Sequence, residues 1–342
     1  MKYQYLGRSG LKVSEICLGT MTFGTEFGWG STKRESRKVF DTFVEAGGNF
    51  FDTANYYTKG TSETFLGQFI KRHREKYVLG TKYSLSTDPQ NPNAGGNSRK
   101  NMTQALEASL KRLNVDYIDL YWVHAWDGFT PIEEIMRALD DMVRAGKILY
   151  IGISDMPAWL VAQANTMAEL KNWTPFVALQ MQYSLIERTI ETEFFPLAQK
   201  MGLSITAWSP LGGGVLSGKY SQKTKRDARY EISKDWGNLM VTEHNLKIAD
   251  AVVEIAKKAN RTPSQVALNW VRQKGVIPII GAKNVAQLKE NLKSLEFELN
   301  DPELRLLDEI SNYPIPFPQN FLMREDMQKT IHGDIRHFID KG

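Results

Sequence analysis

The sequence has few of the features that mark secreted, membrane-bound or nucleic-acid-binding proteins. Among its 342 residues there is one cysteine, Cys17, so no disulfide can form within the chain, and an apolar strand around it suggests a core position. No apolar run reaches the roughly 18–20 residues needed to cross a bilayer. The start, MKYQYLGRSG, lacks the apolar core of a signal peptide. Lys and Arg are scattered, and the net charge is only +4. We therefore expect a cytoplasmic protein without membrane or nucleic-acid partners.

Three common cofactor motifs are also missing. The five histidines form no cluster with metal-ligand spacing, so no metal site is expected. No G-x-G-x-x-G follows the first predicted strand, which argues against a Rossmann dinucleotide site. The stretch GGVLSGKY, residues 213–220, comes close to a P-loop, but Tyr220 stands where a hydroxyl should reach magnesium. We reject a nucleotide triphosphatase, although backbone amides of this stretch could contact a pyrophosphate.

Eight short apolar runs predict the strands of a parallel sheet. Several are continuously apolar, as expected where both faces of a strand are covered. They are residues 16–20, 49–53, 77–82, 117–124, 148–154, 176–180, 204–208 and 275–280. Stretches with the 3.6-residue helical pattern lie between them, including residues 33–46, 99–113, 131–145, 158–171 and 189–201. Gly47, Gly146 and Gly202 follow three of these stretches and are expected to end the helices.

Eight strands with a helix after each predict a (β/α)₈ TIM barrel. A doubly wound open sheet is the alternative, but it would normally have fewer strands at this length. No low-complexity linker divides the chain, so residues 1–342 are expected to form a single domain. A hairpin signal around RSG, residues 8–10, predicts a β-hairpin cap on the barrel floor. A glycine- and charge-rich excursion over residues 209–244, and a charged tail, predict additional loops and helices at the C-terminal side.

Polar side chains stand where the predicted strands end. In a barrel of this kind the C-terminal ends of the strands form the active site. Those ends carry Asp52, Lys82, His124, Ser154, Gln180 and Trp208, and Tyr57 follows the second strand. We therefore expect an acid, a lysine, a histidine and a tyrosine to converge at one mouth.

Four of these residues have complementary chemistry. Asp52 and Lys82 end adjacent strands and are expected to form a partly buried ion pair. The lysine is expected to favour the phenolate of Tyr57 and so to lower its pKa from about 10 towards the working range. Tyr57 could then exchange a proton with a reacting oxygen, which His124 would polarise by hydrogen bonding. The alternative is that each residue is structural, and the convergence of four such groups argues against it.

Longer segments resemble the aldo-keto reductase superfamily, and the match covers nearly the whole chain. They include LGRSGLKVSEICLGTMTFG, FDTANYYTKGTSETFLG, SLKRLNVDYIDLYWVHAWD and AWSPLGGGVLSGKY, in the order and spacing of the family. The pattern is nearer to bacterial and plant members related to the potassium-channel β subunits than to the mammalian aldose reductases. The resemblance implies a barrel that uses NADPH and passes hydride to an aldehyde or ketone. It also implies that Tyr57 donates the proton, that Lys82 and Asp52 adjust the acidity of Tyr57, and that His124 polarises the carbonyl.

The resemblance further implies a set of binding residues. The cofactor contacts would be Thr20, Asp52, Ser154, Asp155, Gln180, Trp208, Ser209, Pro210, Leu211, Gly213, Lys219, Gly281, Lys283, Gln287, Glu290 and Asn291. Among these, Trp208 would stack on the nicotinamide, the stretch 209–219 would hold the pyrophosphate, and 281–291 would hold the adenosine end. The substrate contacts would be Trp29, Tyr57, His124 and Trp126.

Two positions depart from the family pattern. Asp155 stands where the family usually has Asn, and a carboxylate can accept but not donate a hydrogen bond. Close to the ring it should favour the cationic, oxidised nicotinamide. Gln287 stands where a phosphate-binding Arg is common, which leaves Lys283 as the candidate for the adenosine 2′-phosphate. NADPH is therefore the expected cofactor, with NADH as the second choice.

Two functions remain open at this point. The first is a reductase of small-molecule aldehydes or ketones, which the short N-terminus favours. The second is a redox-sensing regulatory subunit resembling the potassium-channel β subunits, with slow or no turnover. A metal-dependent barrel hydrolase is disfavoured by the missing ligands. Loops around Trp29 and Trp126, the stretch 217–244 and the tail 320–342 are expected to select among aromatic aldehydes, sugars and small dicarbonyls. The sequence does not predict the oligomeric state.

Overall fold

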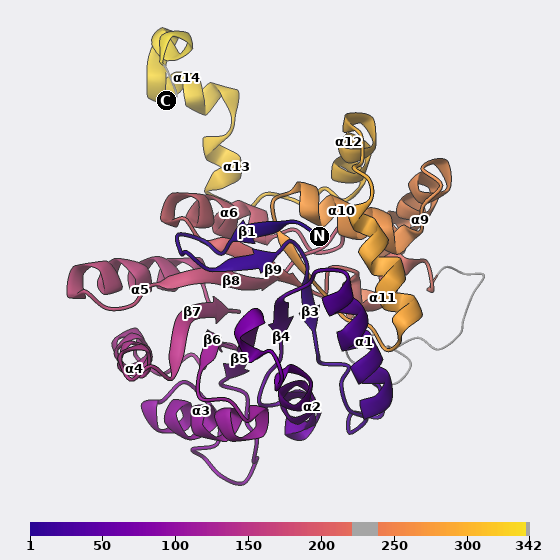
Figure 1. Cartoon of the computed structure of the whole chain (residues 1–342). Helices are drawn as coiled ribbons and strands as arrows, with labels where there is room; N and C mark the ends of the chain where they lie inside the picture. Colours follow the sequence, from indigo (N-terminus) through magenta and orange to yellow (C-terminus); the bar gives the residue numbers. More distant parts are fainter. Residues whose placement is uncertain (221–238, 340–342) are drawn as a thin grey trace.

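A closed barrel of parallel strands forms the centre of the protein (Figure 1). The computed structural model describes residues 1–220 and 239–339. Within them the strands follow one another round the barrel in the order β10-β3-β4-β5-β6-β7-β8-β9. Their bounds are β3 Cys17–Gly19, β4 Phe50–Asp52, β5 Val78–Tyr83, β6 Ile118–Val123, β7 Ile148–Ser154, β8 Phe176–Gln182, β9 Ser204–Trp208 and β10 Ile277–Ile280. All eight predicted strands are present, so the predicted (β/α)₈ barrel is confirmed.

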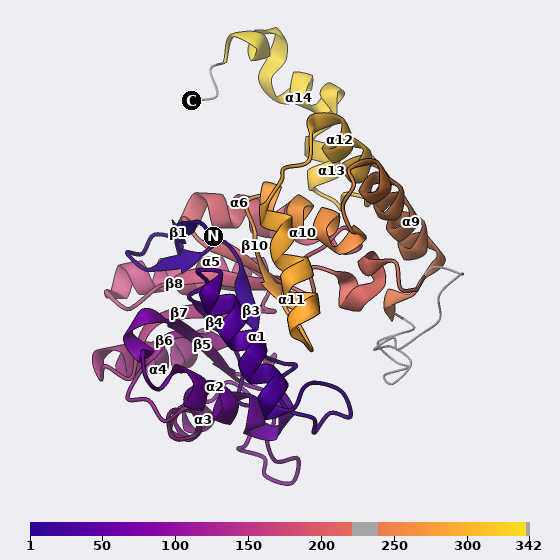
Figure 2. The same cartoon turned by 45° about the vertical axis from the view of Figure 1, so that its right-hand side comes forward.

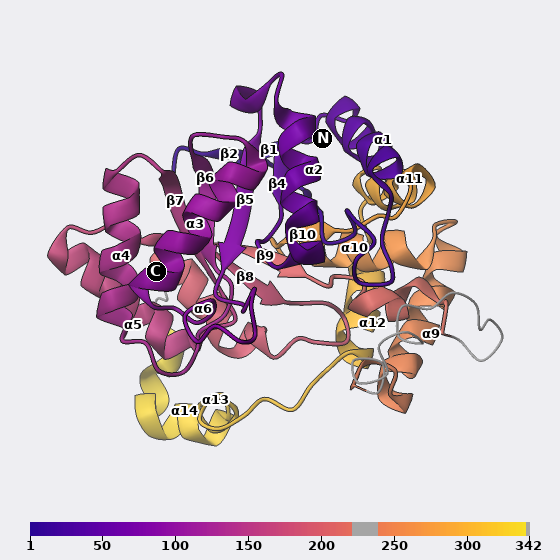
Figure 3. The ribbon, with the colours of Figure 1, turned by 90° about the horizontal axis from the view of Figure 1, so that it is seen from below.

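Helices alternate with the strands and cover the outside of the barrel (Figures 1 and 3). They are α1 Lys33–Glu45, α2 Thr61–Ile70, α3 Arg99–Leu113, α4 Ile132–Arg144, α5 Ala158–Lys171, α6 Ile190–Met201, α9 Glu243–Lys258, α10 Pro263–Gln273, α11 Val285–Leu292 and α12 Asp301–Ile310. Short 3₁₀ turns add η1 Tyr57–Gly60, η2 Arg74–Lys76, η3 Gly212–Ser217 and η4 Lys293–Leu295. The five helices predicted by residue range lie within one residue of their predicted bounds. In the described residues, no helix is both long enough and apolar enough to span a membrane.

Helix α3 shows how the local sequence sets these bounds. The Ser98 hydroxyl accepts a hydrogen bond from the backbone N–H of Asn101, which caps the first turn. Met102 and Leu106 lie on the buried face that the 3.6-residue pattern predicts. Asn114 then adopts a left-handed φ of 53° and ends the helix. Because strand ends and helix ends are fixed in this way, the loops at the barrel mouth start from defined positions.

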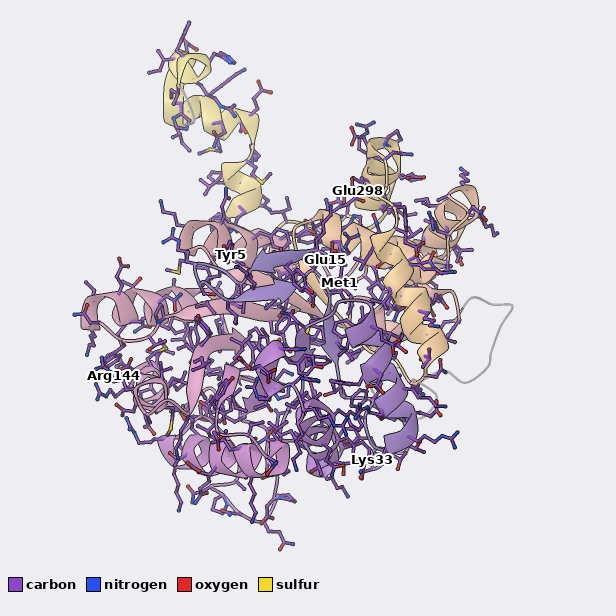
Figure 4. The ribbon with its side chains drawn as sticks, in the orientation of Figure 1. Met1, Tyr5, Glu15, Lys33, Arg144 and Glu298 are labelled. Atoms are coloured by element: carbon purple, nitrogen blue, oxygen red, sulfur yellow. The ribbon has the colours of Figure 1, made fainter. Side chains whose placement is uncertain are left out.

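The N-terminal hairpin closes the floor of the barrel, as predicted. Strands β1 Tyr3–Tyr5 and β2 Lys12–Ser14 pair antiparallel. Leu6 and Val13 are fully buried and pack with Cys17 in the lowest layer of the barrel interior. Cys17 is therefore a core residue, and burial raises the pKa of its thiol well above the ordinary value. Figure 4 views the molecule from this hairpin side and labels Met1, Tyr5 and Glu15 there.

A tryptophan fills the barrel interior below the mouth because two strands carry glycine beside it. A Cβ atom on Gly152 would lie 2.3 Å from Cε3 of Trp122, and one on Gly80 would lie 3.0 Å from its Nε1. Contacts this close leave no room for a larger residue at either position. Gly80 and Gly152 stand two residues before Lys82 and Ser154 on the same strands, so this packing supports two residues of the predicted site.

The C-terminal tail leaves the barrel as an arm. It comprises α13 Gln319–Leu322, α14 Glu325–His332 and η5 Gly333–Phe338. Gln319 at the start of α13 hydrogen-bonds Glu193 on α6, whereas α14 and η5 project away from the barrel (Figures 1 and 2). Phe321, Ile335 and Phe338 are exposed on it. The expected part of the tail in substrate selection stays a prediction. Residues 221–238 of the predicted excursion lie outside the described residues.

Candidate active site

Three of the predicted residues meet around one ammonium group at the C-terminal end of the barrel. Lys82 ends β5 and is fully buried. Its Nζ donates to a carboxylate oxygen of Asp52 on β4, to the carbonyl oxygen of Thr53 at 2.8 Å, and to the hydroxyl of Tyr57 at 3.2 Å. The predicted ion pair between Asp52 and Lys82 is confirmed, and it is more deeply buried than expected.

The second oxygen of Asp52 is held from across the barrel. The side-chain amide of Gln180, on β8, donates to Oδ1 of Asp52 at 2.9 Å. Both carboxylate oxygens therefore have a partner, which is what a buried ion pair needs to offset its loss of hydration. One polar cluster thus joins β4, β5 and β8.

Burial and charge together set the protonation of this cluster. Burial would lower the pKa of Lys82, but Asp52 and Tyr57 outweigh it and the pKa is raised, so the lysine stays a cation. Burial is the largest influence on the Tyr57 phenol, and it leaves the pKa above the ordinary value although Lys82 acts to lower it. Lys82 acts in the expected direction, but the expectation of a net fall in the pKa of Tyr57 is wrong, because burial disfavours the phenolate and Asp52 opposes the ammonium's effect.

His124 follows β6 and completes the predicted group of four. Its ring stands edge-on to the ring of Tyr57, with centroids 5.8 Å apart. Burial, and to a lesser extent Lys82, lowers the pKa of His124 well below the ordinary value, so the imidazole is neutral near pH 7. Its Nδ1 is buried without a hydrogen-bond partner among the described residues. A neutral imidazole has one N–H to donate, and this ring can offer it to a bound group.

Ser154, Asp155 and Trp208 stand at the ends of β7 and β9. The indole Nε1 of Trp208 donates to Oδ1 of Asp155 at 3.1 Å. Asp155 borders solvent but lies within the concave mouth, where partial removal from water raises its pKa to about 6. The Ser154 hydroxyl is buried beside that carboxyl, yet makes no hydrogen bond of normal geometry within the described chain. The Ser154 hydroxyl therefore keeps hydrogen-bonding capacity beside the oriented pair of Asp155 and Trp208.

The segment predicted to hold a pyrophosphate follows β9 directly. Ser209 and Gly213 have left-handed φ angles of 51° and 64°. Pro210 is buried, Leu211 is half-buried and Lys219 is exposed. The turn therefore keeps a lysine in solvent, although its contacts with a cofactor remain predictions.

The segment predicted to hold the adenosine end follows β10. The backbone N–H of Lys283 donates to Oε1 of Gln287 at 2.9 Å. The side-chain amide of Asn291 donates to the carbonyl oxygen of Gly281 at 3.4 Å. Gln287 and Asn291 thus stabilise their own turn, while Glu290 and Lys283 are half-buried at its surface. Their cofactor roles also remain predictions.

Sequence reasoning missed a cluster of buried hydroxyl groups beside Tyr57. The cluster is Thr20, Thr53, Thr58 and Ser62, all fully buried. Thr20 belongs to it, since its hydroxyl donates to the Asp52 carbonyl oxygen at 3.0 Å and lies 2.8 Å from the Ser62 hydroxyl. Direct contact of Thr20 with a cofactor stays a prediction that this burial does not favour. The density of Ser and Thr over residues 53–62 was the available signal.

Aromatic side chains form two groups that include the predicted substrate contacts. Phe27 contacts both Trp29 and Tyr56, with ring centroids 6.0 and 5.8 Å apart. Trp126 contacts Trp159 at 6.3 Å. Sequence reasoning identified Trp29 and Trp126 but missed Phe27 and Trp159, which the structure brings against them.

A cavity of about 370 Å³ opens beside the indole of Trp208. Its described lining includes Asp155, Met156, Met181, Ile190, Phe194 and Trp208. The described lining is mixed, since six of its residues are apolar and four are polar or charged, namely Asp155, Gln182, Glu187 and Thr189. None of the described lining residues belongs to the group of four, so the cavity adjoins that group rather than covering it.

Comparison with known proteins shows the family of this chain. The profile of the Aldo/keto reductase family matches residues 15–312, which contain the barrel and all four residues at its mouth. The chain belongs to this family. A norsolorinic acid reductase of Aspergillus flavus is 35% identical over 334 residues, covering 94% of this chain and 83% of that protein. An uncharacterised oxidoreductase of Bacillus subtilis, YrpG, is 38% identical over 322 residues, and the alignment covers 91% of this chain and 96% of that protein. An aryl-alcohol dehydrogenase of Phanerodontia chrysosporium with NADP(+) in its name is 34% identical over 331 residues, with 91% and 85% coverage.

This aldo/keto reductase is an oxidoreductase, and its family uses nicotinamide cofactors. The residues present fit such a group. The buried Ser154 hydroxyl has no good partner in the described chain and would be satisfied by an amide such as the carboxamide of nicotinamide. Trp208 offers an aromatic surface, and Lys219 and Lys283 offer positive charge for phosphates.

Proposed function

We propose that this aldo/keto reductase reduces aldehydes or ketones to alcohols with NADPH, and that Tyr57 donates the proton. The observation that carries the proposal is the buried ammonium of Lys82, which hydrogen-bonds both the Asp52 carboxylate and the Tyr57 hydroxyl. An ion pair with a purely structural role does not require that its ammonium group also contact a phenol. A buried, charged cluster that ends on a titratable group at a barrel mouth is typical of a catalytic site.

The protein side of the reaction begins with Tyr57 in its protonated form. Its raised pKa keeps the phenol proton in place near neutral pH. As a substrate carbonyl oxygen gains negative charge, Tyr57 transfers this proton to it and becomes a phenolate. Lys82, 3.2 Å from the phenol oxygen, stabilises that phenolate, and Asp52 holds Lys82 in place. His124, neutral and edge-on to Tyr57, donates a hydrogen bond to the same carbonyl oxygen.

The cofactor would be held by residues at the ends of the last four barrel strands. Ser154 and Gln180 would bind the carboxamide, and Trp208 would stack on the ring. When bound, the nicotinamide supplies the hydride. Lys283 is the proposed cation for the 2′-phosphate, acting as a point charge. The relative with NADP(+) in its name supports NADPH over NADH.

We further propose aromatic aldehydes and ketones as the substrate class. Relatives include proteins named norsolorinic acid reductase and aryl-alcohol dehydrogenase. The aromatic groups built on Trp29 and Trp126 could bind an aromatic ring by stacking or edge contacts. The cavity beside Trp208, lined by both apolar and polar side chains, adds space for a bulky substituent.

The test is cofactor oxidation with an electron-poor aromatic aldehyde, measured for the wild type and Tyr57→Phe with NADPH and with NADH. We expect the variant to lose about 10²- to 10⁴-fold in kcat, the usual contribution of a positioned acid. Its NADPH affinity, measured by quenching of tryptophan fluorescence, should be unchanged. Equal turnover of the two proteins would show that Tyr57 is not the acid. Equal kcat/KM with both cofactors would refute the role given to Lys283.

The regulatory-subunit alternative predicts a different result. NADPH would bind tightly, and neither protein would turn over any of a panel of aromatic aldehydes. The names of the relatives, which are reductases and dehydrogenases, do not favour this alternative.

A further inference from the structure

The turn that follows Tyr57 has an unusual backbone. Thr58 has φ 46° and ψ 43°, Lys59 has φ 53° and ψ 35°, and Gly60 has φ 90°. A left-handed conformation is easy for glycine but is a genuine outlier for a β-branched residue such as threonine. Such a residue persists only where its surroundings fix it, and such positions concentrate at functional sites.

The hydroxyl of Thr58 is what fixes it. Thr58 is fully buried, and its Oγ1 donates to the carbonyl oxygen of Phe23 at 2.7 Å. The same oxygen accepts a hydrogen bond from the backbone N–H of Ser62 at 3.0 Å. A Cβ on Gly24 would lie 2.8 Å from this hydroxyl, so the loop after β3 packs directly against it. One side chain therefore connects the turn to the loop after β3 and to the first turn of α2.

These contacts continue to the strand ends that carry the catalytic cluster. The Ser62 hydroxyl donates to the carbonyl oxygen of Thr20 at 2.7 Å and lies 2.9 Å from the Thr53 hydroxyl. The carbonyl oxygen of Thr53 in turn accepts a hydrogen bond from Lys82 at 2.8 Å. The backbone on the C-terminal side of Tyr57 is thus connected, through Thr58, Ser62 and Thr53, to the lysine that its phenol contacts.

We propose that Thr58 is a positioning residue for Tyr57. Its hydroxyl holds the left-handed turn at residues 58–60 and so keeps the phenol oxygen within hydrogen-bond distance of Lys82 and in line with the substrate. The proposal rests on the proposed role of Tyr57 as the proton donor. Misplacement of a reacting group by about 1 Å can reduce a rate by about 100-fold, so the two hydrogen bonds of one buried hydroxyl are enough to matter.

The experiment compares three single variants in the holoenzyme, with kcat expressed per NADPH-binding site so that unfolded protein does not count. Thr58→Gly removes the hydroxyl but suits the left-handed backbone. The relief of backbone strain offsets part of the cost of the two lost hydrogen bonds, so we expect a folded protein with a lowered unfolding midpoint. We expect its kcat to fall about 10- to 100-fold while the NADPH affinity and KM change less than twofold. Thr58→Ser retains the hydroxyl and should keep kcat within about threefold of the wild type. Lys59→Gly, which changes an exposed residue of the same left-handed turn, is the matched control and should keep wild-type kcat.

Full kcat in Thr58→Gly, or an equal loss in Lys59→Gly, would overturn the proposal. So would a loss in Thr58→Ser as large as that in Thr58→Gly. A double variant separates positioning from a general structural effect. If Thr58 acts only through the Tyr57 phenol, Thr58→Gly should cause no further loss of kcat in the Tyr57→Phe background. A further loss of the same size would place its effect elsewhere. If Tyr57→Phe alone keeps full activity, the proposed function fails, and this result is distinguishable from failure of the Thr58 proposal.

Discussion

Two sides of the barrel mouth differ in how completely their polar side chains are hydrogen-bonded within the protein. The side to which we assign proton transfer, Asp52, Tyr57 and Lys82, is joined by hydrogen bonds within the protein. Gln180 and the Thr53 carbonyl oxygen complete its contacts. The side to which we assign the cofactor, Ser154, Asp155 and Trp208, includes a hydrogen bond between the last two and, in the described chain, a buried Ser154 hydroxyl without a partner of good geometry.

The difference shows whether folding or a bound ligand fixes the side chains on each side. The proton-transfer side is organised by folding, because its charges are buried and must be paired whether or not a ligand is present. On the side to which we assign the cofactor, the Ser154 hydroxyl keeps hydrogen-bonding capacity in the described chain, and we propose that a ligand uses it. Substitutions on the first side should therefore change both stability and rate, and those on the second should change ligand affinity alone.

The largest effect should come from Lys82→Met. This change leaves the Asp52 carboxylate buried without its cation, which costs about 3–5 kcal/mol of unfolding free energy. Urea denaturation followed by circular dichroism measures this loss, and kcat should fall together with it.

The double variant Asp52→Asn/Lys82→Met sharpens the result. It removes both charges, so it should recover much of the lost stability but none of the lost activity. If the single and double variants were equally unstable, the pair would matter through shape rather than charge, and the comparison between the two sides would weaken.

Ser154→Ala should show the opposite behaviour. The hydroxyl makes no well-formed hydrogen bond in the described chain, so its removal should change the unfolding free energy by less than about 0.5 kcal/mol. The NADPH affinity should fall about 3- to 10-fold, which corresponds to one neutral hydrogen bond. Isothermal titration beside urea denaturation tests both parts. A drop in stability with unchanged affinity would reverse the roles we assign to the two sides.

The sequence was sufficient to predict the barrel and the convergence of the four mouth residues. Both depend on patterns that are local in the chain: apolar strands, amphipathic helices, and the polar residues Asp52, Lys82 and His124 where strands end. The ion pair followed because neighbouring parallel strands place their ends side by side.

Features that depend on three-dimensional surroundings were not predictable. The direction of the Tyr57 pKa shift depends on the balance between burial and two opposite charges, and that balance needs coordinates. The left-handed Thr58 is likewise imposed by Phe23 and Ser62 rather than by its own propensity. The tail from Gln319 onwards has an amphipathic sequence that does not specify whether it packs on the mouth or projects from it.

The smallest expected effect concerns Asp155, which stands where the family usually has Asn. Asp155 has a pKa raised to about 6, so its carboxyl is mainly neutral below that pH and mainly charged above it. The charged form should favour the cationic ring of NADP⁺ over NADPH. As the pH rises through about 6, the ratio of the Kd for NADPH to the Kd for NADP⁺ should therefore increase in the wild type. Because Asp155 borders solvent, screening limits the change to about two- to fivefold. In Asp155→Asn the ratio should be lower at high pH and independent of pH, as fluorescence titrations at pH values on either side of about 6 would measure. A ratio that rises equally in both proteins would place the titrating group elsewhere and leave Asp155 with the structural task of orienting Trp208.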